Sequence, residues 1–294
     1  MFKLREGFIL AGSIIKIRGI MNGLSDTEKK VANFILEYPS EISDLSIGNM
    51  SKRCGASEAT IVRFCRAVGY SGFKDFKIDI TRDMAYLEVN SKDDKYADIE
   101  NGDDIDIIIK NISNNNKKAI DNTSKIISTK SIKEAIEALD NSKRIEFFGV
   151  GASYVIALDA FQKFCRINKL ATAHADTHIQ TISAANLTKG DVAVAISYSG
   201  ETKDVYDAIN IARSTGATTI SITKYGSSSI SDICDINLYV SSPEINIRSG
   251  ATSSRIAQLN VIDILFAGVA SKRFNETQNY LEKTRVAIKA KKFK

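Results

Sequence analysis

The chain has 294 residues, of which 44% are hydrophobic and 26% are charged, and its formal net charge at pH 7 is +5. This length favours two domains over one, and this composition excludes a largely disordered chain because it supplies enough apolar surface for packed cores. The charge is too small by itself to indicate a nucleic-acid partner, so the distribution of the charges has to be examined.

The chain shows no sign of export. Its four cysteines are widely spaced, with neither a C-x-x-C motif nor a pairing pattern, which favours buried free thiols in a reducing compartment. The apolar runs near the amino terminus are short, and Lys16 and Arg18 interrupt them. We therefore expect a soluble cytoplasmic protein that has no signal peptide and no membrane span.

The first predicted unit is a bundle of three short helices. Ser25 and Glu28 form a capping box, which predicts the start of a helix. Residues 45–54 predict a second short helix, and a Gly-Ala-Ser turn follows it. Ser57 is expected to cap a third helix, and no strand pattern occurs in this part of the chain.

Two helices joined by a glycine-containing turn are typical of a helix-turn-helix, whose second helix enters the major groove of DNA. Residues 51–82 carry seven Lys or Arg against three Asp or Glu, an excess that suits phosphate contacts. We expect Glu58, Thr60 and Arg63 to be exposed and to contact base edges. The predicted DNA-binding residues are Lys52, Arg53, Ser57, Glu58, Thr60, Arg63, Arg66 and Lys74. A three-helix bundle without a DNA function is the alternative.

An acidic segment follows the predicted bundle. Residues 88–106 carry eight Asp or Glu against two Lys, with little apolar periodicity, which indicates a linker. We predict a helix-turn-helix domain at residues 1–85, an acidic linker at 86–115, and a second domain with a basic carboxyl-terminal helix at 116–294.

From residue 144 onward, buried strands alternate with amphipathic helices. The strands are predicted at 144–151, 191–197, 218–223 and 236–241. This alternation predicts a parallel sheet with helices on both faces, so the expected fold class is all-α for the first domain and α/β for the second. Residues 255–271 form one long apolar helix, which could lie in the core or at a subunit interface.

Two of the predicted strands end in loops that are rich in glycine and hydroxyl groups. "SYSGET" occupies residues 197–202, and "GVGAS" occupies residues 149–153. Parallel sheets bind ligands at the carboxyl ends of their strands, where helix N-termini offer free N–H groups and a partial positive charge. The expected ligand is a phosphate held by hydroxyls and amides. Taken alone, the earlier loop could be an ordinary turn between a strand and a helix.

The motif G-x-G-x-S followed by S-x-S-G-x-T resembles the sugar isomerase (SIS) domain, which binds phosphosugars, over about residues 120–270. The resemblance implies that serine and threonine hydroxyls of both loops hold the phosphate and that Tyr198 offers a backbone amide. From their position after the last strand, Glu244 and Arg248 could face the sugar. The predicted ligand-binding residues are Gly151, Ser153, Ser197, Tyr198, Ser199, Gly200, Thr202, Glu244 and Arg248.

SIS domains also occur in aldose–ketose isomerases, which need a base and often a histidine. His174 and His178 have i, i+4 spacing but no helical apolar stripe around them, so we expect a polar loop and no metal site. Glu201 and Glu244 are possible bases. A phosphosugar isomerase with a helical oligomerisation domain is therefore the alternative function.

The amino-terminal part decides between these functions. "LSDTEKKVANFILEYPSEI" followed by "SEATIVRFCRAVGYSGFKDFK" closely resembles the DNA-binding domain of RpiR-type transcriptional regulators, which precedes a SIS domain. The resemblance implies a regulator, by default a repressor, of sugar or amino-sugar metabolism genes. Its partners would be double-stranded operator DNA and a phosphosugar effector, and it would form a homodimer or homotetramer. We predict no catalytic residue and no cofactor.

Overall fold

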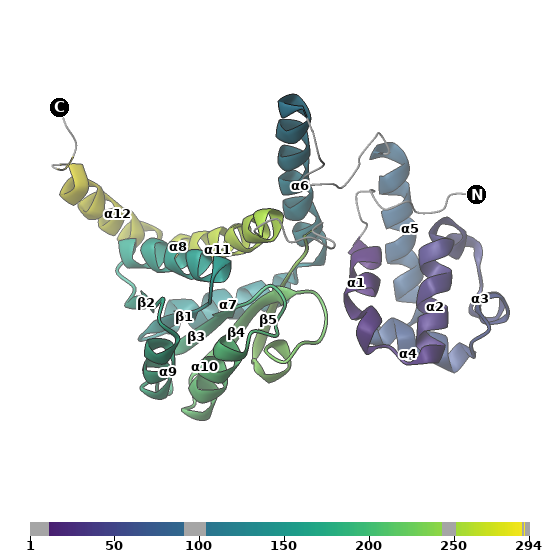
Figure 1. Cartoon of the computed structure of the whole chain (residues 1–294), viewed down its shortest axis with the longest axis horizontal. Helices are drawn as coiled ribbons and strands as arrows, with labels where there is room; N and C mark the ends of the chain where they lie inside the picture. Colours follow the sequence, from purple (N-terminus) through teal and green to yellow (C-terminus); the bar gives the residue numbers. More distant parts are fainter. Residues whose placement is uncertain (1–11, 91–103, 243–250, 290, 292–294) are drawn as a thin grey trace. The chain divides into compact units, whose positions relative to one another are not determined.

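The computed structural model describes residues 12–90, 104–242, 251–289 and 291 (Figure 1). The chain forms two compact units, the first made mainly of residues up to 126 and the second mainly of residues from 127 onward. Within the described residues, no helix is both long and apolar enough to cross a lipid bilayer.

The first unit is entirely helical in its described part. Its helices are α1 (Gly12–Ile20), α2 (Asp26–Glu37), α3 (Ile47–Cys54), α4 (Glu58–Ala67), α5 (Phe73–Asn90) and α6 (Ile105–Ile126), with 3-10 turns at Met21–Gly23 and Pro39–Asp44. Apolar side chains of α2 to α5 form one core, in which Ile35, Met50 and Ile61 are fully buried. Phe64 and Phe76 meet edge to face in this core, with ring centroids 6.3 Å apart.

The local signals in the sequence place the helix ends correctly. The capping box of Ser25 and Glu28 is present at the start of α2. The Ser57 hydroxyl accepts a hydrogen bond from the Thr60 backbone N–H at 3.2 Å and so caps α4. Gly55 ends α3 in the left-handed conformation, with φ of 67°. The predicted helix-turn-helix is therefore confirmed as α3, a short turn and α4.

The predicted acidic linker is partly helical. α5 continues to Asn90, and α6 begins at Ile105, so both helices extend into the range 86–115. The prediction of a linker rested on the number of charges and did not take account of the isoleucines near the start of α6. Charged residues are tolerated on an exposed helix face, so a high charge does not exclude a helix. The limits that we gave for the two domains remain a prediction.

The second unit is a parallel sheet between two layers of helices, as predicted (Figure 1). The strands are β1 (Ile145–Phe148), β2 (Ala171–Ala173), β3 (Val192–Ile196), β4 (Thr218–Lys224) and β5 (Ile236–Val240), in the order β2-β1-β3-β4-β5. The helices are α7 (Thr129–Asn141), α8 (Ala152–Arg166), α9 (Thr177–Ala185), α10 (Lys203–Ser214), α11 (Thr252–Lys272) and α12 (Phe274–Lys289), with a 3-10 turn at Ser231–Ile233.

The sheet is buried on both faces. α9 and α10 cover one face, where Ala193, Ala195 and Ile209 belong to one apolar cluster. α7, α8 and α11 cover the other face, where the rings of Phe147 and Phe164 lie 5.7 Å apart. Because strands with two buried faces must be apolar at every position, their sequences read as continuous apolar runs.

The long apolar helix α11 packs within this unit. Its residues Val261, Ile262 and Leu265 are buried inside the chain itself, and Phe266 meets Phe164 at 6.1 Å between ring centroids. Core packing therefore accounts for the apolar sequence of residues 255–271, one of the two interpretations that the sequence left open.

β2 and α9 were not predicted. His174 follows β2, and His178 lies in α9, whose start is capped by the Asp176 side chain accepting from the Ile179 N–H at 3.0 Å. The expected loop around the two histidines is therefore wrong for His178. The strand has only three residues and the helix has a weak apolar stripe, so neither gives a clear periodic pattern.

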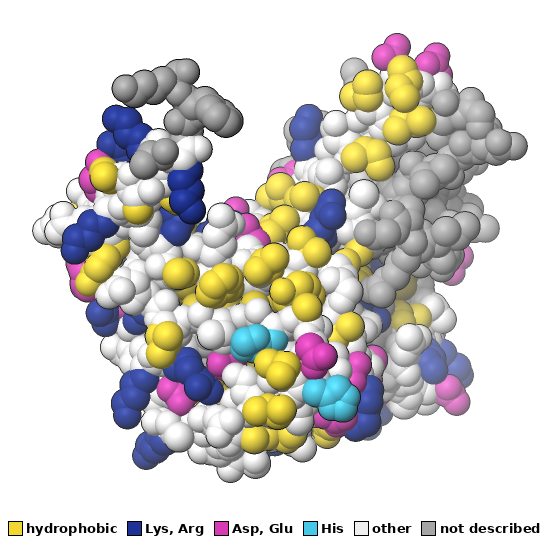
Figure 2. All heavy atoms as spheres, turned by 60° about the vertical axis from the view of Figure 1, so that its left-hand side comes forward, with side chains coloured by type: hydrophobic (Ala, Val, Ile, Leu, Met, Phe, Trp, Pro, Cys, Tyr) yellow, Lys and Arg dark blue, Asp and Glu magenta, His cyan; other side chains and the backbone are white. Residues whose placement is uncertain are grey.

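Hydrophobic side chains gather near these histidines on one face of the second unit (Figure 2). The large apolar side chains that α8 and α9 leave exposed are Val155, Leu158, Ile179 and Ile182. Apolar residues that gather on one face of a protein mark a candidate interaction surface.

Candidate functional site

The two glycine-containing loops lie at one point of the sheet. The chain runs from β1 outward to β2 and then returns to β3 on the other side of β1, so the strand order reverses between β1 and β3. Phe148 pairs with Ala195, which places the loop after β1 beside the loop after β3. Ligands of open α/β sheets bind in the crevice at such a reversal.

The first loop, residues 149–153, needs both of its glycines. A Cβ at Gly149 would lie 2.7 Å from the backbone oxygen of Ser153, and Gly151 has a φ of 59°. Ser153 is half-buried in the first turn of α8. Because its two glycines carry no side chains, this loop places backbone and the Ser153 hydroxyl at the edge of the sheet.

The side chain of Gln180 in α9 is hydrogen-bonded to this first loop. Its Nε2 donates hydrogen bonds to the backbone oxygens of Gly149 at 2.9 Å and His174 at 2.7 Å, and the residue is only 1% exposed. It thereby joins the ends of β1 and β2. No pattern in the sequence indicates this role, because α9 itself was not predicted.

The second loop, residues 197–202, is closed by its own hydroxyls. Ser197 is buried, and its Oγ lies 2.9 Å from Thr202 Oγ1 and accepts from the Gly200 N–H at 3.2 Å. The Ser199 hydroxyl accepts from the Glu201 N–H at 3.2 Å. Ser199 and Thr202 are half-buried, whereas Ser197 faces inward and braces the loop.

A third segment, which follows β4, supports the second loop. The Lys224 N–H donates to the Tyr198 oxygen at 2.8 Å, and the Ile230 N–H donates to the Gly200 oxygen at 3.0 Å. The Glu201 carboxylate accepts from the N–H and the hydroxyl of Ser229, at 3.0 and 2.6 Å. The run of serines at 227–229 after a predicted strand is the signal for this segment in the sequence.

The electrostatics at this edge of the sheet favour an anion. Neither Gly151 nor Thr202 makes a side-chain cap at the start of α8 or α10, whereas side chains cap α3, α4, α7 and α9. The first N–H groups of α8 and α10 thus lack a side-chain cap among the described residues, although those of Ser153 and Tyr154 donate to the backbone oxygens of Val150 and Gly151 at 3.2 and 3.1 Å. The hydrogen bonds from Ser229 hold the pKa of Glu201 below its ordinary value.

The structure thus brings together seven of the nine predicted ligand-binding residues on two adjacent loops. Glu244 and Arg248 lie outside the described residues.

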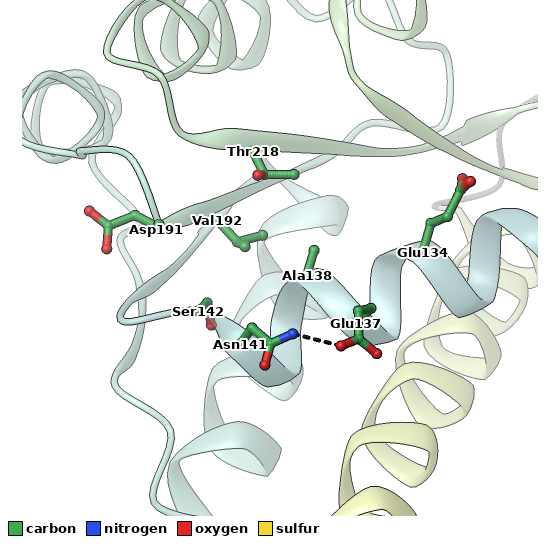
Figure 3. A pocket seen from close by; sticks show the side chains of 9 residues that line it. Glu134, Glu137, Ala138, Asn141, Ser142, Asp191, Val192 and Thr218 are labelled. Atoms are coloured by element: carbon green, nitrogen blue, oxygen red, sulfur yellow. Dashed lines mark hydrogen bonds between the residues drawn. The ribbon is translucent and has the colours of Figure 1, made fainter.

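A cavity lies elsewhere on the second unit. It has a volume of about 350 Å³ and is lined by α7 and by the residues at the amino ends of β3 and β4, including Asp191 and Thr218 (Figure 3). Asn141 donates to the Glu137 carboxylate at 2.7 Å beside it. The cavity is therefore at the opposite edge of the sheet from the two loops.

The second predicted site is the exposed face of α4 and its surroundings. Glu58, Arg63 and Arg66 are exposed on α4, as expected. Thr60 is only 8% exposed, with its Oγ1 2.9 Å from the Ser57 hydroxyl, so the expectation that it is exposed is wrong. The physical reason is that its side chain turns toward the cap of its own helix.

The flanking basic residues differ in their surroundings. Lys52 and Lys74 are exposed. The Arg53 guanidinium forms an ion pair with Glu41 and lies 5.0 Å from the ring centroid of Phe34, so it is engaged with the region of α2. Arg63 Nε donates to Glu28 Oε1 at 3.1 Å. The Ser25 hydroxyl, and to a smaller extent Arg63, hold the pKa of Glu28 below its ordinary value.

Comparison with known proteins identifies both domains. Residues 12–86 match the helix-turn-helix domain of the rpiR family, and residues 138–268 match the SIS domain. An HTH-type transcriptional regulator of Caldanaerobacter subterraneus is 46% identical over 278 residues, which are 94% of this chain and 96% of that protein. The HTH-type transcriptional regulator HexR of Pseudomonas aeruginosa is 32% identical over 93% of this chain and 94% of its own length.

A solved structure covers both units. The NanR protein of Vibrio vulnificus, in complex with ManNAc-6P, is 26% identical and has a TM-score of 0.61, over 96% of this chain and 100% of that one. Each of these relatives matches this chain over nearly its whole length. The chain therefore belongs to the rpiR family of helix-turn-helix transcriptional regulators that carry a SIS domain.

Proposed function

We propose that this regulator senses a phosphosugar in its SIS domain and changes its affinity for operator DNA in response. The observation that carries the proposal is the pair of loops at the β1–β3 strand reversal, where two helices start without side-chain caps. A phosphate there would accept hydrogen bonds from the first N–H groups of both helices. NanR of Vibrio vulnificus, whose structure contains ManNAc-6P, supports a sugar phosphate as the ligand.

The residues of the two loops would have different roles in binding the phosphosugar. The half-buried hydroxyls of Ser153, Ser199 and Thr202 would contact the phosphate, while buried Ser197 would hold Thr202 in place. Gly151, Gly200 and the Tyr198 N–H would supply backbone close to the ligand. Glu244 and Arg248, which follow β5, would face the sugar hydroxyls.

The DNA would be read by α4. Glu58 and Arg63 would contact base edges, and Lys52, Arg66 and Lys74 would contact phosphates. Ser57 and Thr60 would act by shaping the start of α4, and Arg53 would act through its contact with α2. Each copy would bind one half of a palindromic site, so we propose a homodimer, or a homotetramer built from two dimers. The exposed apolar face of α8 and α9 offers a second copy a surface.

We propose that the protein acts in the cytoplasm as a repressor of sugar or amino-sugar metabolism genes and does not turn over its ligand. An isomerase of this fold would need a free base at the crevice. Both oxygens of Glu201, the one acidic residue of the second loop, accept hydrogen bonds from Ser229, which suits a structural role better than proton transfer. An isomerase would convert one sugar phosphate into another and would show no salt-dependent affinity for DNA.

Thermal unfolding against a panel of sugar phosphates tests the ligand class, with each compound compared with its unphosphorylated sugar. A ligand at a hundred times its dissociation constant should stabilise the SIS domain by about 2.7 kcal/mol. A rise of the unfolding temperature with a phosphorylated sugar alone supports the proposal. Equal shifts with both forms of a sugar would contradict it.

A further inference from the structure

We propose that Glu28 is a positioning residue that holds Arg63 for reading a guanine in each half of the operator. This inference rests on the proposed DNA binding and adds the base that is read. The carboxylate that caps α2 would thus also set the sequence specificity of α4.

The geometry divides the two oxygens of Glu28 between two partners. Oε2 accepts from the N–H and the hydroxyl of Ser25, at 3.1 and 2.6 Å, and completes the capping box of α2. Oε1 accepts from Arg63 Nε at 3.1 Å. The Glu28 side chain is 12% exposed, while that of Arg63 is 64% exposed. An anchored carboxylate therefore holds the inner edge of a guanidinium whose outer part faces solvent.

The hydrogen bond from Arg63 Nε to Glu28 indicates that Arg63 would read a guanine. The bond to Glu28 leaves the two Nη groups of Arg63 for another partner. A guanidinium can donate two hydrogen bonds to O6 and N7 of guanine, and this pair distinguishes guanine from the other bases in the major groove. Arg63 is the sixth of the ten residues of α4 and is exposed on this helix, which is the recognition helix of the motif. Fixing the side chain before binding also lowers the entropy lost on binding.

Arg53, on the preceding helix α3, shows the contrast. Arg53 lies against the rings of Phe34 and Tyr38, at 5.0 and 5.8 Å from their centroids, and pairs with Glu41. Its guanidinium face is covered by α2, whereas that of Arg63 is held only at Nε. A purely structural Glu28–Arg63 pair would contribute to stability without any effect on base preference, and this difference can be measured.

The test is selection of bound duplexes from a randomised DNA library by the full chain. The wild-type protein should enrich a palindrome with a guanine at one fixed position of each half. Arg63→Lys keeps the charge but loses the fork of donors, so it should reduce the preference at that position by roughly tenfold or more. Glu28→Gln should relax the preference at the same position, because a neutral amide holds Nε less firmly.

A matched control separates specificity from helix stability. Ser25→Ala removes the hydroxyl donor to Oε2 but keeps the backbone donor and the Oε1–Arg63 bond, so it should lower the unfolding temperature and leave the enriched sequence unchanged. Glutamine is also accepted in a capping box, so Glu28→Gln should destabilise α2 less than Ser25→Ala does.

The outcomes are distinct. Full guanine preference in Glu28→Gln, or an unchanged enriched sequence in Arg63→Lys, would overturn the inference. The inference would also be overturned if Ser25→Ala reduced the guanine preference at that position as strongly as Glu28→Gln does. Failure of the wild-type chain to enrich any sequence would contradict the proposed DNA binding itself, which is a different result.

Discussion

Gly200 and Ser228 approach each other so closely that a Cβ at position 200 would lie 2.5 Å from the Ser228 Cβ and would overlap its hydroxyl. Gly200 also has a φ of 72°, a conformation that side chains disfavour. The loop after β3 is thus packed directly on the segment after β4. The position of the proposed phosphate site depends on this contact, which side chains at position 200 would prevent.

Gly200→Ala should therefore prevent phosphosugar binding and destabilise the SIS domain. The backbone conformation alone costs an alanine about 1–2 kcal/mol, and the overlap with Ser228 adds to it. Gly216→Ala is the matched control, because Gly216 has a φ of 84° but only one atom, Lys189 Cβ at 4.0 Å, near its Cβ position. Thermal unfolding should show the larger loss of stability for Gly200→Ala. Equal losses would contradict the close packing.

Glu201→Gln should weaken phosphosugar binding by loosening the second loop, and it should also change the pH dependence of binding. The pKa of Glu201 is lowered from 4.5 in the folded protein, so its contribution is complete above pH 4.5 and is lost as the pH falls through the lowered value. The ratio of wild-type to variant affinity should therefore fall toward one in acid. Because the ligand phosphate titrates near pH 6 in both proteins, this ratio removes its effect.

Ser229→Ala gives an independent check of this contact. It removes the hydroxyl donor to Glu201 but keeps the backbone donor, so its effect on affinity should be smaller than that of Glu201→Gln. A ratio of affinities for Glu201→Gln that stayed constant while the pH fell from neutrality to well below 4.5, through the titration of Glu201, would be evidence against the role of the charged carboxylate.

Ser199→Ala combined with Thr202→Ala should abolish the phosphosugar response and leave DNA binding intact, because these hydroxyls lie at the start of α10 in the proposed site. Ser214→Ala combined with Thr215→Ala changes the same residue types at the other end of this helix and should have no effect on the response. Calorimetric titration with a sugar phosphate measures both pairs. A normal response in the first variant would show that the phosphate binds elsewhere.

The DNA affinity should depend on salt through a few phosphate contacts. Each contact contributes a slope of about 0.9 to the fall of log K with log salt concentration. Lys52→Ala and Lys74→Ala should each reduce the slope by about one and weaken binding to all duplexes alike. Lys130→Ala, on exposed α7 of the SIS domain, is the control with the same charge change. Slopes that remain unchanged in the first two variants would exclude these lysines from the interface.

The helices of the first unit were predictable because their ends carry local signals. The capping box at Ser25, the cap at Ser57 and the glycine after α3 each act within a few residues, so they are visible in the sequence. The exposure of Thr60 was not predictable from helical periodicity, because it depends on the rotamer that its hydroxyl adopts toward Ser57. The sequence likewise showed Glu28 as a cap and gave no sign of its contact with Arg63, which is 35 residues away.

In the second unit the long buried strands were predictable, whereas the three-residue β2 and the helix α9 were not. The two ligand loops could be recognised from their glycines and hydroxyls, since backbone geometry there restricts the residue type. Gln180 could not be recognised in this way, and the run of serines at 227–229 marks a segment without showing the contact of Ser229 with Glu201, because each residue acts through contacts with segments distant in the chain. Their roles follow from tertiary structure and not from any local pattern.

The most direct test of the account is the affinity of the full chain for its enriched duplex, measured by fluorescence anisotropy with and without each sugar phosphate. A phosphorylated sugar should change the DNA dissociation constant while its parent sugar does not, and by linkage the duplex should change the affinity for that sugar phosphate by the same factor. The change should vanish in the Ser199→Ala, Thr202→Ala double variant. A DNA dissociation constant that stays the same with every sugar phosphate, including those that raise the unfolding temperature, would contradict the central claim.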